Sequence, residues 1–185
     1  MIKAYLLAFS PAGSRWEEAR LEAELGCQLN PQDAGIISGS AFVLANAGDP
    51  LEAIRLCERS LRINPRDPVG YSYACTNLAN AHLAARNYAK GIDWALRATS
   101  AAPGFAPAHA YMAALYVGAG DIERAKLAFE TAHRLAPGAV RTRPKPEPTD
   151  PSRPRDRGSE SRERYNTFLR IAAGLEDHSA AEALR

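Results

Sequence analysis

The sequence lacks the motifs that mark most enzymes and membrane proteins. It has no G-x-x-x-x-G-K-[ST] or G-x-G-x-x-G phosphate loop and no H-E-x-x-H zinc motif. None of its four histidines has a serine, cysteine or carboxylate at a catalytic spacing. No stretch approaches the roughly 18 apolar residues that a membrane-spanning helix needs. We therefore expect neither an enzyme nor a membrane protein, with no cofactor and no metal site.

Cysteine and net charge are also scarce. The three cysteines, Cys27, Cys57 and Cys75, are odd in number and show no C-x-x-C spacing. This pattern favours buried thiols in a reducing compartment, which predicts a cytoplasmic location. The formal net charge is only +2 over 185 residues, too small to indicate nucleic acid as a partner.

What the sequence does contain is a repeated helical hairpin. From Ala106 to Pro137, two amphipathic patterns flank a glycine-rich turn at 118–121. Similar segments precede it. A proline recurs at 31, 65, 103 and 137, and a small residue recurs at Ala19, Ala53, Gly91 and Ala125. Both markers advance by the same steps, so chance is a poor explanation. A hairpin that cannot bury both its faces alone needs copies beside it, which predicts an all-α solenoid.

This unit resembles the tetratricopeptide repeat (TPR), a helix–turn–helix of about 34 residues with small residues at fixed positions and a closing proline. The resemblance covers Met1 to Pro137. It implies a right-handed solenoid of about four repeats, near 1–33, 34–67, 68–105 and 106–137, the first slightly truncated. It also implies a protein-interaction module, because such repeats serve many unrelated proteins by binding partners. Asp49, Asp67 and Asp121 are expected to cap helices.

Most of the chain resembles a narrower group, the C-terminal TPR region of bacterial adenylate cyclase-related and winged-helix regulator-related proteins. The shared features are an N-P-R-D-P junction at 64–68, a longer third repeat, A-H-L-A-A-R-N-Y, W-A-L-R-A and P-G-F-A-P-A. The segment Arg162–Leu175 is similar to the short helix that ends many of those proteins. The resemblance implies a regulatory module that is normally attached to a catalytic or DNA-binding domain. This chain is then either a detached module or part of a longer reading frame.

Composition changes after Pro137. The region 138–160 is rich in proline and arginine, and we expect a disordered linker there. A helix at 161–175 follows, with Tyr165, Phe168 and Leu169 on its apolar side, and residues 176–185 form a tail. The apolar side needs a partner surface, most simply the exposed end of the fourth repeat.

The TPR resemblance implies that the first helix of each repeat lines a concave face. The positions that match give the candidate binding residues Tyr5, Phe42, Asn46, Tyr73, Asn77, Asn80 and Tyr111. This strip is aromatic, rich in amides and uncharged, so it suits a protein or peptide partner with little charge.

Several alternatives stay open at this point. Tyr73 and Tyr111 can instead pack between repeats, and the groove can hold a small ligand in a sensor. The apolar first repeat can support self-association. At the crossings, we expect Gly91 to contact the first helix of its own repeat, because glycine allows a close approach.

Overall fold

The computed structural model describes residues 2–8, 15–137 and 158–184, and the secondary structure assigned within those ranges is entirely helical. The helices are α1 (Ile2–Ala8), α2 (Trp16–Leu29), α3 (Ala34–Ala47), α4 (Pro50–Ile63), α5 (Pro68–Ala84), α6 (Tyr88–Ala101), α7 (Ala106–Ala119), α8 (Ile122–Leu135), α9 (Ser159–Ala172) and α10 (Ser179–Glu182). None of these helices is long and apolar enough to cross a membrane.

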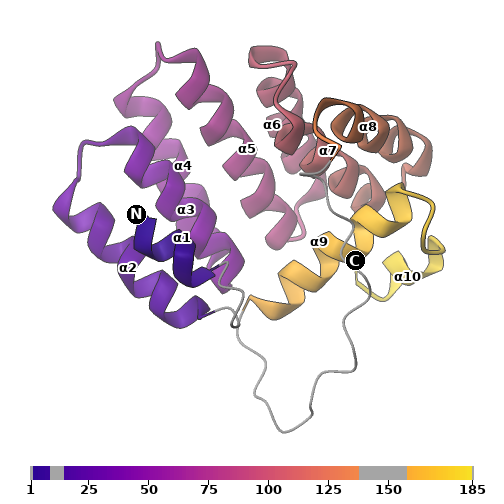
Figure 1. Ribbon diagram of the computed structural model, residues 1–185, viewed down its shortest axis with the longest axis horizontal. Helices are drawn as coiled ribbons and strands as arrows, with labels where there is room; N and C mark the ends of the chain where they lie inside the picture. Colours follow the sequence, from indigo (N-terminus) through magenta and orange to yellow (C-terminus); the bar gives the residue numbers. More distant parts are fainter. Residues whose placement is uncertain (1, 9–14, 138–157, 185) are drawn as a thin grey trace, which may run out of the picture.

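The first eight helices form four consecutive hairpins that stack side by side (Figure 1). The first helices α1, α3, α5 and α7 contact one another in sequence and make an inner row. Each second helix, α2, α4 and α6, packs against its own first helix and the first helix of the next repeat. This arrangement is an all-α repeat solenoid, as the repeat spacing predicts. The longer third repeat carries its extra length in α5, which has 17 residues where α3 and α7 have 14.

The predicted helix caps are confirmed. The carboxylates of Asp49, Asp67 and Asp121 accept hydrogen bonds from backbone N–H groups in the first turns of α4, α5 and α8, at 3.3, 3.0 and 3.1 Å. Gly48 and Gly120 end α3 and α7 with φ angles of 95° and 87°, a left-handed conformation that glycine adopts without strain. These signals set where each hairpin turns.

Small residues sit at the centre of the outer helices. Ala19, Ala53, Gly91 and Ala125 are all buried. A Cβ atom built on Gly91 would lie 2.3 Å from a methyl carbon of Leu115, and the three nearest atoms all belong to that side chain. Leu115 lies on α7, in the following repeat, and not on α5 as we expected. Gly91 therefore marks the contact between repeats three and four.

The last long helix, α9, crosses the solenoid instead of extending it (Figure 1). It begins at Ser159 and ends at Ala172, where we expected a helix at 161–175. Most of the region predicted as a linker, 138–157, lies outside the described residues. The expected contact with repeat four is present, through α7 and α8, but α9 also contacts α3 and α5. The helix thus lies along the inner row.

The Gly91 contact yields a stability prediction. Gly91→Leu should lower the free energy of unfolding by about 1–3 kcal/mol, because the added side chain overpacks the site held by Leu115. Urea denaturation measures the change. The loss should shrink when Leu115→Ala is made in the same chain.

A matched control is Gly104→Ala, since a Cβ atom at Gly104 meets nothing within 4 Å. Equal effects of Gly91→Leu with and without Leu115→Ala would contradict the assigned contact.

Candidate functional site

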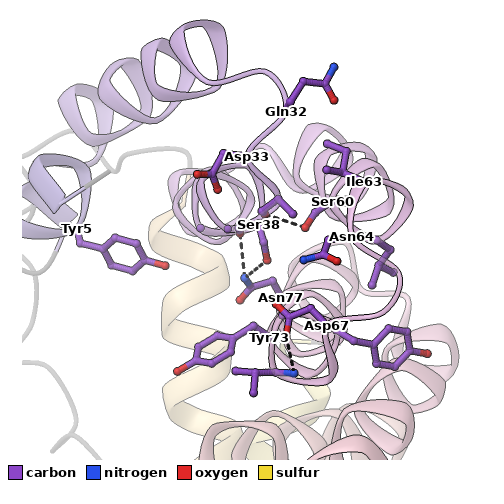
Figure 2. Close-up of a pocket in the computed structure, with 17 residues that line it drawn as sticks. Tyr5, Gln32, Asp33, Ser38, Ser60, Ile63, Asn64, Asp67, Tyr73 and Asn77 are labelled. Carbon is purple, nitrogen blue, oxygen red and sulfur yellow. Dashed lines mark hydrogen bonds between the residues drawn. The ribbon is translucent and has the colours of Figure 1, made fainter.

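The inner row of helices carries a cavity of about 780 Å³ (Figure 2). It lies between the N-terminal parts of α3 and α5, with Tyr5 of α1 facing it across the gap. Three of the seven predicted binding residues, Tyr5, Tyr73 and Asn77, line it together with Ser38. We call these four residues the open half of the inner face.

Aromatic rings give the open half its apolar surface. Tyr73 is 51% exposed and packs at 4.6 Å, centroid to centroid, against Phe105 at the start of the next repeat. Tyr5 stacks on Phe42 of α3 at 5.8 Å. Burial is the main cause that raises the pKa of the Tyr5 phenol, so its hydroxyl stays a neutral donor near pH 7. Tyr73 thus takes part in both roles considered from the sequence, packing between repeats and presenting a ring to the cavity.

Two carboxylates bring negative charge to this cavity. Asp33 and Asp67 line it while they cap α3 and α5, through bonds of 2.9 and 3.0 Å from backbone N–H groups to one carboxylate oxygen each. The described residues around the cavity include no lysine, arginine or histidine. Sequence reasoning assigned Asp67 only as a cap. Its second role appears once α3 and α5 are placed side by side.

Asn77 is already engaged inside the protein. Its side-chain amide donates to the backbone oxygen of Ser38 at 2.9 Å and to the Ser38 hydroxyl at 3.0 Å, which ties α5 to α3 (Figure 2). Asn80, one turn further along α5, differs. Its side chain is only 5% exposed, and its Nδ2 atom is buried with no hydrogen-bond partner among the described residues. Asn80 therefore carries an unused donor on the inner helix α5.

Helix α9 lies over other predicted binding residues, which we call the covered half: Phe42, Asn46 and Tyr111. Tyr111 packs against Tyr165 of α9 with ring centroids 4.8 Å apart. The Asn46 backbone oxygen accepts a hydrogen bond from Arg162 of α9. Phe42 packs against the core cluster to which α7 and α9 both contribute.

Gly158 permits the close approach at the start of α9. A Cβ atom there would lie 1.7 Å from the Asn46 backbone oxygen, too close for any other residue. Arg162 also lies over the buried Trp16 ring, with its guanidinium carbon 4.3 Å from the centroid. Such a cation–π contact is stronger when it is withdrawn from water. The start of α9 is thus held against α2 and α3.

A buried arginine holds the middle of α9. Arg164 is 2% exposed. Its Nη1 atom donates to the carbonyl oxygens of Leu83 and Ala84 at the end of α5, at 3.4 and 3.3 Å, and its Nε atom to that of Leu184 at 2.8 Å. A cation is favourable beside the C-terminal carbonyls of a helix. Desolvation is the main cause that lowers the pKa of Arg164.

Within the described residues, no group of three or more histidine, cysteine and acidic side chains is placed to hold a metal ion. Burial raises the pKa of the Cys57 thiol far above its usual range and that of Cys75 to about 11, so both stay protonated at neutral pH.

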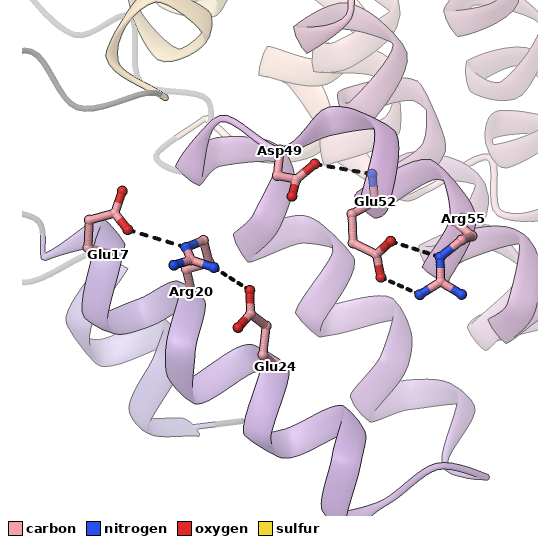
Figure 3. Close-up of polar contacts among 6 residues, drawn as sticks. All are labelled: Glu17, Arg20, Glu24, Asp49, Glu52 and Arg55. Atoms are coloured by element: carbon pink, nitrogen blue, oxygen red, sulfur yellow. Dashed lines mark hydrogen bonds and ion pairs between the residues drawn. The ribbon is translucent and has the colours of Figure 1, made fainter.

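The outer face carries short-range polar contacts. Arg20 pairs with Glu17 and Glu24 along α2, and Arg55 pairs with Glu52 on α4 (Figure 3). Exposed pairs of this kind contribute little stability. They place the charges of α2 and α4 in solvent, while the cavity lies on the inner row.

Comparisons with known proteins support the fold. The chain is similar to solved structures of MamA: residues 41 to the end of the protein from Desulfovibrio magneticus RS-1 (TM-score 0.55, 18% identity, 99% of this chain and 86% of that chain), an RS-1 ArsTM double mutant (0.54, 19%, 91% and 80%) and a further crystal structure (0.54, 16%, 89% and 91%). At these identities the likeness shows the fold alone. Neither the family models nor the curated proteins gave a match.

The contrast between Asn77 and Asn80 gives a paired prediction. Asn77→Leu should lower the free energy of unfolding by about 1–3 kcal/mol, because it removes two hydrogen bonds and leaves the buried Ser38 hydroxyl without its donor. Asn80→Leu, a change of the same shape, should leave stability unchanged or raise it, because it removes an unpaired buried amide. Chemical denaturation of both variants tests the contrast. Equal destabilisation would show that Asn80 has a partner after all.

Proposed function

We propose that this chain is a protein-interaction module that holds a peptide segment of a partner in the open half of its inner face. The observation that carries the proposal is the cavity itself, which brings Tyr5 of repeat one together with Tyr73 and Asn77 of repeat three. A concave site with aromatic walls and a few polar groups is typical of ligand binding. The likeness to repeat solenoids agrees with a binding role, since such folds present extended concave surfaces.

The lining residues indicate the chemistry of the partner. Tyrosine rings supply contact area at little cost in conformational entropy, which favours an apolar or aromatic side chain in the bound segment. The carboxylates of Asp33 and Asp67 add a preference for one lysine or arginine, because no cation balances them among the described lining residues. The partner segment is therefore weakly charged, with a single basic residue.

Two narrower roles follow from the same site. The cavity also falls within the size range of small-molecule sites, about 300–1,000 Å³, so a small-ligand sensor is the second candidate. The relation to the repeat regions of cyclase-related and regulator-related proteins stays a prediction from the sequence. In that setting, binding at the open half would regulate the activity of an attached domain.

Selection from a random peptide library on the immobilised full-length chain tests the proposal. We expect the selected peptides to share an apolar or aromatic residue and one basic residue, and to bind with little dependence on salt. Tyr73→Ala should weaken their binding about tenfold or more, because aromatic anchors dominate such interfaces.

Two variants separate charge from structure. Asp33→Asn and Asp67→Asn keep a residue that caps helices well but remove the charge, so they should reduce only the preference for a basic residue. Leu127→Ala, at an exposed position on α8, serves as the control. Selected peptides that bind Tyr73→Ala as well as they bind the unmodified chain would overturn the proposal. Selection of single amino-acid-sized ligands over longer peptides would favour the sensor.

A further inference from the structure

Helix α9 is seated on the inner face in the manner of a bound ligand. It does not continue the stack of hairpins, and 20 residues separate Gly158 from the end of the described repeats at Pro137. It contacts the inner helices α3, α5 and α7 as well as α8. A helix laid into a groove of other helices is a common form of partner recognition.

The recognition elements of α9 are compact and chemically distinct. Arg164 meets the carbonyl oxygens at the end of α5, and the next residue, Tyr165, packs on Tyr111. Phe168, one turn further, is fully buried and packs against Tyr88 at 6.1 Å between ring centroids. The side chains of α9 that contact the inner helices thus follow the pattern Arg-Tyr-x-x-Phe-Leu on one face of the helix.

One feature makes the contact of α9 with the inner face imperfect. The guanidinium of Arg164 is withdrawn from water, yet among the described residues its carboxylate partner is the exposed Glu160 at 3.3 Å, which Arg86 shares. A buried charge that is mainly paired with neutral carbonyls contributes less than it would with a full counter-ion.

Because α9 belongs to the same chain as the repeats, even imperfect contacts can keep it bound to them. When a ligand belongs to the same chain, its effective concentration reaches roughly the millimolar range, so modest affinity keeps the site filled. A second copy of the chain offers the same contacts without that advantage. The occupant that displaces α9 must therefore bind better than α9 does.

We infer that the covered half is a second receptor surface, specific for a partner's amphipathic helix with the arginine–aromatic pattern of α9, and that α9 occupies this surface until such a helix displaces it. The inference rests on the proposed use of the inner face and extends it to the half that α9 covers. Asn80 lies on α5 between Asn77 of the open half and the carbonyl groups that hold Arg164, so one partner can engage both halves.

The test uses the full-length chain and a fluorescent peptide with the sequence of residues 158–184. Arg164→Ala in the chain should release α9, seen as faster hydrogen exchange at 159–172 with α3–α8 still protected. The released chain should then bind the peptide at least about tenfold tighter than the unmodified chain does, because its internal competitor is weakened. Glu163→Ala, an exposed neighbour on α9, should change neither measurement.

Further variants locate the bound peptide. Adding Tyr111→Ala to the released chain, or carrying Arg164→Ala in the peptide, should each weaken binding about tenfold or more. Tyr73→Ala in the released chain should not affect this peptide. A helix-displaying library selected on the released chain should return the arginine–aromatic pattern, which the unmodified chain should not enrich.

Several outcomes would overturn the inference. Loss of protection in α3–α8 together with α9, in Arg164→Ala and also in Arg162→Ala, would make α9 an inseparable part of the fold. Failure of the Arg164→Ala chain to bind the peptide would show that the covered half is not a receptor surface. A dimer of the unmodified chain by light scattering, disrupted by Arg164→Ala, would assign the surface to a second copy. Each of these leaves the open half to its own test with Tyr73→Ala.

Discussion

The close crossing of helices at small residues is the constraint on which the rest of the structure depends. Ala19, Ala53 and Gly91 are buried on outer helices that each pack between two inner helices, and Ala125 is buried on α8, which packs against α7 and α9. A larger side chain at such a crossing would separate the backbones and tilt the next hairpin. The clash that a Cβ atom on Gly91 would make with Leu115 shows how closely repeats three and four approach. The curvature of the inner face, and so the shape of its cavity, follows from these crossings.

Local rules were sufficient to predict the repeats. Period, caps and turn glycines are all encoded within a few residues of where they act, and the Asp49, Asp67 and Asp121 caps formed as expected. The spacing of the repeat markers led us to expect that Gly91 contacts its own repeat, whereas the atoms nearest to it belong to Leu115 of the next one. In a solenoid, however, an outer helix also packs against the first helix of the repeat that follows, so half of its neighbours come from further along the chain.

The candidate site was harder to predict because its chemistry depends on distant segments. The sequence indicated an uncharged strip, yet Asp33 and Asp67 reach the cavity from helix caps that lie outside the strip. Asn77 was expected to offer its amide to a partner, and the structure shows that amide bonded to Ser38 of the preceding repeat. The position of α9 has no local signal, since Arg164 contacts residues about 80 positions earlier in the chain.

The contacts between hairpins and the contacts of α9 differ in how strongly they select a particular sequence. Hairpins pack through alanine, leucine and valine, and such surfaces stabilise the stack while accepting many sequences of similar volume. The seat of α9 instead uses a buried guanidinium on carbonyl oxygens and an aromatic pair. A helix without arginine at that place would withdraw this charged donor from both carbonyl oxygens, although that of Leu83 also accepts from the backbone N–H of Arg86 at 3.1 Å. The inner face is therefore selective for the side chains of the helix that it binds, whereas the packing between repeats requires only side chains of suitable volume.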